Sequence, residues 1–316
     1  MTNIHHENES FVSSSTVPNT PFSSSDSVPA SNDGDFARLI PANRLARLAF
    51  SNVATQLQTY PEFNPHAMLF MHIQSAVVDE TSASEAEDRF AIETDPILWS
   101  GYYRFNLRIM PSSFLLGWVA GSGRENLDFG GIDFLLTLHK GQHVAGRHGR
   151  FKHNESGIFL LHSDGKRIVV DGKEELRKTQ RAFTSPITGI EFGDLTYTLA
   201  FTDLGGYREQ LAEVQREHGR KYEPPAFLDP TPSSTDYVLK KYLIQGAFSQ
   251  GSTCIVSSGF DIITGSPVAI KKIKQIGNAP KAINEVDVLR AIKPHVRLLL
   301  YYATTLVYLF ILGSDL

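Results

Sequence analysis

The chain has 316 residues, of which 20% are charged, and its formal net charge at pH 7 is −4. This length suits two modest domains and a tail, because single domains usually span about 100–200 residues. The small negative charge excludes the strongly basic field that is typical of nucleic-acid binding, and it gives no general attraction to an acidic membrane. We therefore expect no nucleic-acid and no membrane partner, whereas the oligomeric state stays open.

The cysteine content and the first residues indicate the cellular compartment. Cys254 is the single cysteine, so the chain forms no internal disulfide and offers no metal-ligand spacing. The first thirty residues lack the apolar core of a signal peptide. Both observations predict a cytoplasmic or nuclear protein. The apolar run at 298–312 is shorter than the roughly 18 residues of a membrane span, so strands are favoured there and a tail anchor is the alternative.

The N-terminal third has little regular patterning. Residues 1–35 are rich in Ser, Thr, Asn and Pro, and they cannot bury enough apolar surface to offset the entropy of ordering, which predicts a disordered tail. Residues 36–58 carry a weak amphipathic pattern that fits a short helix. We expect residues 36–97 to form a semi-ordered extension that rests on the next domain.

Short strands with turn signals dominate the middle of the chain. Between residues 98 and 204, alternating apolar segments are separated by pairs such as Asp164-Gly165 and Asp171-Gly172. This pattern predicts an all-β sandwich over 98–204. Residues 205–236 follow with a mostly polar helical pattern and a Pro/Ser linker.

The predicted sandwich contains three short motifs: Gly123-Arg124, the stretch from Ala145 to His148, and Asp164-Gly165. They resemble motifs of the forkhead-associated (FHA) domain, whose loops at one end bind phosphothreonine peptides. The resemblance implies that Arg124 contacts the phosphate and that His148 braces the loop. It also implies a phosphothreonine-containing protein as the partner.

The FHA motifs depart from the family pattern at two positions. Ala145 stands where the family has a serine that contacts phosphate, and the Asp164 carboxylate is expected to repel a phosphopeptide. Arg147 can compensate, because guanidinium groups pair bidentately with phosphate. The alternative is that the basic residues of 139–153 are a solvated strand edge, where charge discourages edge pairing.

The last segment, 237–316, is organised around the strand Val268-Ala269-Ile270-Lys271 and a helical pattern that carries Glu285. Glu285, Leu289 and Ile292 recur at helical spacing, so a carboxylate lies at the edge of an apolar stripe. Alternation places Ala269 and Lys271 on one face of the strand. A lysine that ends a strand and a glutamate on the next helix can form a buried ion pair over a nucleotide.

These features resemble the small lobe of a serine/threonine protein kinase of the calcium/calmodulin-dependent or checkpoint group. The resemblance implies a small α+β lobe, with a five-stranded antiparallel sheet and one helix, in which 296–303 and 306–312 are the last two strands. It also implies that ATP is the cofactor, with Lys271 holding its phosphates and Glu285 orienting Lys271. The implied ATP-binding residues are Ile244, Gly246, Ala247, Phe248, Ser249, Val256, Ala269, Lys271 and Glu285.

The kinase motifs are incomplete in this sequence. The family has three glycines in the loop that covers the phosphates, and Ile244 and Ser249 stand at the first and third of these positions. Neither a His-Arg-Asp loop nor an Asp-Phe-Gly motif occurs in the sequence. Those motifs supply the catalytic base and the magnesium ligands, so we expect a kinase-family chain that is catalytically incompetent as it stands. The alternative is a phosphothreonine-binding or scaffold protein with a vestigial kinase lobe. A third explanation is that the early end is an artefact of how the coding sequence was assembled.

Overall fold

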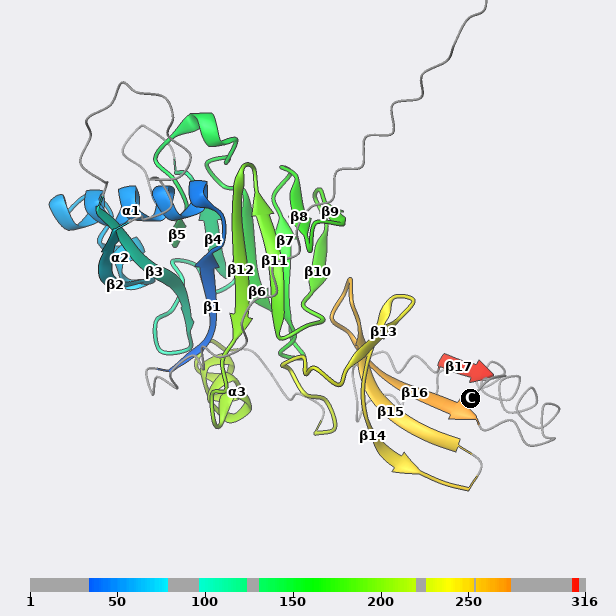
Figure 1. Cartoon of the computed structure of the whole chain (residues 1–316). Helices are drawn as coiled ribbons and strands as arrows, with labels where there is room; N and C mark the ends of the chain where they lie inside the picture. The colour runs from blue at the N-terminus through cyan, green and yellow to red at the C-terminus, as the bar shows by residue number, and fades with distance from the viewer. Residues whose placement is uncertain are drawn as a thin grey trace, which may run out of the picture. The chain divides into compact units, whose positions relative to one another are not determined.

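The computed structural model describes residues 34–78, 97–123, 131–219, 226–252, 254–273 and 309–312 (Figure 1). All of them belong to one compact unit. Residues 1–33 of the disordered tail predicted over 1–35, the helix with Glu285 and the strand at 296–303 lie outside the described residues. Asp35 is buried and begins the strand Asp35–Pro41, so the tail prediction is wrong at its C-terminal end. In the described part of the chain, no helix is long and apolar enough to cross a membrane.

The first sheet of the sandwich has seven strands, and each pairs antiparallel with its neighbours. Its strands in spatial order are β2 (Met71–Val78), β3 (Ile97–Asn106), β1 (Asp35–Pro41), β12 (Leu195–Phe201), β11 (Ile187–Phe192), β8 (Ile168–Val170) and β9 (Glu174–Leu176).

The second sheet has five strands and faces the first (Figure 1). Its order is β10 (Gln180–Ala182), β7 (Phe159–Ser163), β6 (Gly149–His153), β4 (Trp118–Gly121) and β5 (Phe134–Leu135). The described helical segments are α1 (Arg44–Thr59), α2 (Pro65–Leu69), the 3-10 turn η2 (Lys140–Gln142) and α3 (Tyr207–Glu217).

Aromatic side chains from both sheets form the core. Phe105 of β3 packs edge-to-face on Phe134, Phe151 and Phe159 of the facing sheet, at ring-centroid distances of 4.7, 4.9 and 5.2 Å. All four rings are buried. Such pairs contribute about 0.5–1.5 kcal/mol each beyond their area burial. The predicted β-sandwich is therefore confirmed, with its core between the two sheets.

The described part of the predicted semi-ordered extension, residues 36–78, is instead integral to the sandwich, so that prediction is wrong there. β1 pairs on one side with β12 and on the other with β3, and Leu39 is fully buried. Asn43 caps α1, because its side chain accepts a hydrogen bond from Ala46 N at 2.8 Å. The sequence pattern missed β1 because its pairing partner β12 is distant in the chain, and a single short strand next to a helix has no periodicity of its own.

A third sheet of five strands follows the linker, in the order β13 (Tyr237–Leu239), β14 (Tyr242–Gln250), β15 (Cys254–Asp261), β16 (Pro267–Ile273) and β17 (Leu309–Leu312). β13 to β16 pair antiparallel, but β17 is parallel to β16. The predicted fully antiparallel sheet is therefore wrong at this edge. Parallel neighbours require a crossover connection out of the sheet, and residues 274–308 are long enough to provide one.

The β15–β16 turn contacts β10 and the turn between β6 and β7 of the sandwich. Ala182 N of β10 donates a hydrogen bond to Ile262 O at 2.6 Å, and Asn154 Nδ2 donates one to Gly265 O at 2.9 Å. Gly265 has φ +69°, and a Cβ there would lie 3.2 Å from Ile158 Cβ, so this position favours glycine.

Candidate functional site

Three loops meet at one end of the sandwich, and they carry the three motifs found in the sequence. Gly123 N, at the end of β4, donates a hydrogen bond to Gly146 O at 3.2 Å. Asp164 N, after β7, donates one to His148 O, also at 3.2 Å. The structure thus brings together Gly123, the loop at 145–148 and Asp164. Arg124, the predicted phosphate contact, lies outside the described residues.

His148 holds the central loop in place from within. Its side chain is buried, its Nδ1 accepts a hydrogen bond from Ala145 N at 3.2 Å, and its Nε2 donates one to Arg167 O at 2.8 Å. Burial lowers the pKa of His148; the bond to Arg167 opposes this shift, and the nearby charge of Lys166 adds to it. A neutral ring fits both bonds, because one ring nitrogen accepts and the other donates.

The charged residues of these loops differ in their surroundings. Arg147 is exposed, and its guanidinium lies next to Gly131, where an added Cβ would be 3.2 Å from Arg147 Nη2. The Asp164 carboxylate lies 3.2 Å from both Arg150 Nε and His162 Nδ1. The negative charge that was expected to repel a phosphopeptide is thus balanced by a neighbouring guanidinium.

A cleft of about 490 Å³ lies beside the braced loop. Lys166 and Arg167 contribute positive charge to its lining, and Glu191 and Asp194 contribute negative charge. Other lining residues include His143, Val144, Ala145, His148, Val169 and Gly193. A cleft of this size and mixed polarity can hold a few residues of an extended peptide.

In the third sheet, three of the predicted nucleotide residues lie together. Val256 is the cross-strand partner of Lys271, and Ala269 lies two residues before Lys271 on the same strand. Directly paired residues and alternate residues share one face of a sheet, so all three side chains lie on one face. Lys271 is half-buried, whereas Lys272 is exposed, as alternation along β16 predicts.

Other predicted nucleotide residues lie elsewhere. Ile244 is buried on the opposite face, in a cluster with Tyr242, Val268 and Ile270. Gly246, Ala247, Phe248 and Ser249 are exposed and belong to β14, whose register shifts between Ile244 and Ser249. These four residues, which the kinase resemblance assigns to ATP binding, therefore lie on an irregular strand. Glu285 lies outside the described residues.

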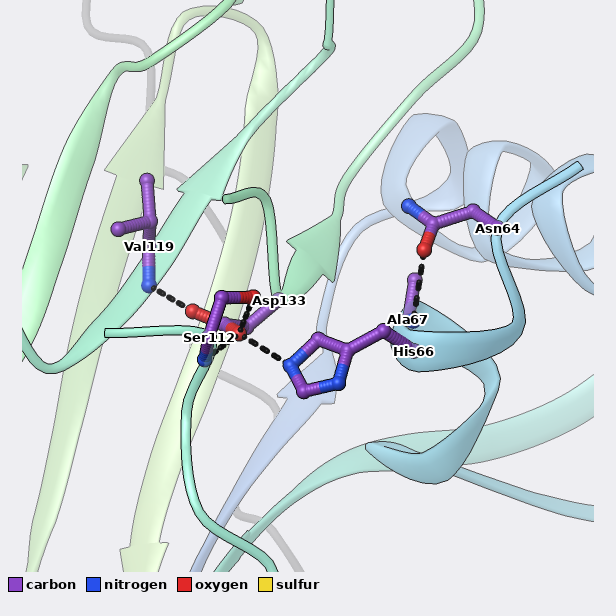
Figure 2. Close-up of polar contacts among 6 residues, drawn as sticks. All are labelled: Asn64, His66, Ala67, Ser112, Val119 and Asp133. Carbon is purple, nitrogen blue, oxygen red and sulfur yellow. Dashed lines mark hydrogen bonds and ion pairs between the residues drawn. The ribbon is translucent and has the colours of Figure 1, made fainter. Parts of the chain in front are cut away.

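Figure 2 shows a second polar cluster, which the sequence did not reveal because its members are far apart in the chain. Asp133 is fully buried, and its Oδ1 accepts hydrogen bonds from Ser112 N, Ser112 Oγ and His66 Nε2, each at 2.8 Å. Its Oδ2 accepts a bond from Val119 N at 2.8 Å. The half-buried His66 thus contacts a buried carboxylate.

This cluster is structural in character. In a nucleophilic triad the histidine stands between hydroxyl and carboxylate, whereas here the Ser112 hydroxyl donates directly to Asp133. Asp133 instead connects α2, which carries His66, to the start of β4 at Val119. Among the described residues, no group of three or more His, Cys, Asp or Glu side chains could hold a metal ion.

Comparisons with known proteins give little further information. No protein-family model and no curated protein sequence matches this chain. A solved structure of Rad53 residues 1–466 in complex with AMP-PNP matches at 17% identity and a TM-score of 0.37, over 61% of this chain. The match covers 46% of the Rad53 chain, less than half of it.

Proposed function

We propose that the sandwich binds a phosphothreonine-containing segment of a partner protein at the loops that carry Gly123, residues 145–148 and Asp164. The observation that carries this proposal is the buried His148, which bonds to Ala145 N and Arg167 O and so holds the loop in one conformation. A pre-organised loop binds more tightly, because less ordering entropy is lost on association.

The charges of the site support a phosphorylated ligand. Arg147 is exposed beside the braced loop, and Arg124 follows Gly123 directly in the sequence. Guanidinium groups bind phosphate bidentately, which can offset the missing serine hydroxyl at Ala145. The adjacent cleft carries both signs of charge, so residues flanking the phosphothreonine would include both acidic and basic side chains.

We further propose that the third sheet is the nucleotide-facing half of a kinase-like lobe and that Lys271 contacts the phosphates of ATP. The common face of Val256, Ala269 and Lys271 supports this contact. The phosphothreonine-binding sandwich on the same chain would raise the local concentration of the kinase-like lobe near a phosphorylated partner. The second candidate is a non-catalytic scaffold, which the opposite placement of Ile244 and the irregular strand around Gly246 favour.

The phosphopeptide proposal is tested by titrating the full chain with matched phosphothreonine and threonine peptide libraries. We expect binding only with the phosphorylated library and its loss in Arg124→Ala and in Arg147→Ala. Arg216→Ala is the matched control, because Arg216 is an exposed arginine on α3. Equal binding of both libraries, or equal affinity in all three variants, would contradict the proposal.

The nucleotide proposal is tested by calorimetry with Mg-ATP. The catalytic loop and magnesium ligands of the family have no counterpart in this sequence, so we expect weak affinity that is reduced further in Lys271→Ala. Binding that is independent of Lys271 would contradict the assigned face.

A further inference from the structure

The linker just before the third sheet folds back onto β14. We call residues 227–229 the linker strap. Its Phe227 ring stacks on Phe248 at a centroid distance of 5.2 Å and an interplanar angle of 23°. Leu228 is buried in an apolar cluster with Leu243 of β14, Phe260 of β15 and three residues of the sandwich, Ile158, Leu160 and Ala182. The strap therefore contacts β14 at two points through apolar side chains.

A third contact is polar and two-sided. Asp229 N donates a hydrogen bond to Gln245 Oε1 at 3.0 Å, and Gln245 Nε2 donates one to Asp229 O at 2.8 Å. Gln245 is buried, so the strap supplies both partners for an amide that would otherwise be costly to bury. This pair fixes the strap in register with β14.

The strap lies on the same sheet face as Ala269 and Lys271, at the end of that face near Leu243. Leu243 and Phe260 are cross-strand partners, and Phe260 is in turn paired with Pro267. Leu243, Phe260 and Pro267 thus form a row across the three strands, with their side chains on one face of the sheet. Pro267, Ala269 and Lys271 are alternate residues of β16, so this row shares its face with Ala269 and Lys271. Leu228 belongs to the same buried cluster as Leu243 and Phe260, and this cluster also contains Ile158, Leu160 and Ala182 of the sandwich. The strap and the sandwich therefore cover the Leu243 end of this row together.

We infer that the linker strap is an intramolecular lid on this face, which must be released before a nucleotide can lie against β14. The inference rests on the proposed nucleotide contact of the lobe. A lid that occupies the site lowers the apparent affinity by the fraction of molecules in the open state. The weak nucleotide affinity expected for this chain would then have a cause within the fold, besides the absent catalytic motifs.

The test uses the full chain and the double variant Phe227→Ala with Gln245→Ala, which removes the stacking and the amide pair but keeps the buried Leu228. Tyr237→Ala is the matched control, because Tyr237 is an exposed aromatic residue on β13 of the same sheet. Hydrogen exchange reports release of the strap, and calorimetry with Mg-ATP reports nucleotide affinity.

We expect the double variant to exchange faster at residues 243–248 and to bind Mg-ATP at least about tenfold more tightly than the parent chain. The control should behave like the parent, and adding Lys271→Ala to the double variant should remove the gain. Unchanged exchange, or a gain that survives loss of Lys271, would overturn the inference.

The remaining outcomes separate this inference from the proposals on which it rests. Tight Mg-ATP binding by the parent, with the strap still protected, would refute the lid and leave the nucleotide contact standing. Faster exchange with no Mg-ATP binding in either protein would end both the lid and the nucleotide contact. Phosphopeptide binding by the sandwich is measured separately and is unaffected by either result.

Discussion

Replacing His148 with alanine removes the side chain on which the proposed phosphopeptide loop depends. The change deletes a ring that is 1% exposed and packs edge-to-face on Phe192 at 5.5 Å. It also leaves Ala145 N and Arg167 O without their hydrogen-bond partner. Losing two hydrogen bonds of about 1 kcal/mol each, together with a buried ring, should destabilise the domain by about 2–4 kcal/mol.

The loss in unfolding free energy is measured by urea unfolding. The change in phosphopeptide affinity is measured by titration under conditions where the variant remains folded. We expect a weaker phosphopeptide complex, because the freed loop must then be ordered on binding. His139→Ala is the matched control: His139 is exposed and does not line the cleft, so its loss should change stability by less than about 1 kcal/mol and leave binding unchanged. Equal effects of the two substitutions on stability and on binding would refute the bracing role.

Three further predictions concern the sandwich. Burial lowers the pKa of His148 from 6.5, so the contribution of the neutral ring to stability is complete above pH 6.5 and is lost as the pH falls through the folded-state pKa. Urea unfolding midpoints measured at several pH values should show this loss. His148→Gln should make the unfolding midpoint less dependent on pH. Asp133→Ala removes the acceptor of four donors, namely Ser112 N, Ser112 Oγ, His66 Nε2 and the buried Val119 N, and should cost about 3–5 kcal/mol by thermal or urea unfolding. A loss below about 1 kcal/mol would contradict the structural role of Asp133. Gly121→Ala places a Cβ 2.0 Å from Gly146 O, so it should destabilise the domain by about 1–3 kcal/mol and weaken phosphopeptide binding. Gly141→Ala should do neither, because a Cβ at Gly141 has no atom within 4 Å.

The sandwich could be predicted from sequence because its strands are short, alternate regularly and are separated by glycine and aspartate turns. β12 lies where the alternation places it, at Leu195–Phe201. β1 could not be predicted, because one strand is recognised mainly through its pairing, and both of its partners are distant in the chain. The parallel pairing of β16 with β17 could not be predicted either, because sequence periodicity does not indicate the direction of a strand.

The candidate sites were predictable to a different extent. Alternation along β16 was sufficient to place Ala269 and Lys271 on one face and Lys272 on the other. Motif spacing was sufficient to single out His148. The ion pair between Arg150 and Asp164, in contrast, requires β6 and β7 to be paired in their observed register, which no local pattern encodes. The same is true of Asp133 and His66, which fold together from two separate segments.

The phosphopeptide proposal is tested most directly by following backbone amide signals of the full chain in NMR spectra during titration with one phosphothreonine peptide and its unphosphorylated counterpart. The account predicts that the phosphopeptide shifts the signals of Ser122 and Gly123, of residues 145–148 and of residues 164–167, and that the unphosphorylated peptide leaves them in place. Shifts confined to other parts of the sandwich, such as the edge strand β2, or the same shifts with both peptides, would contradict it.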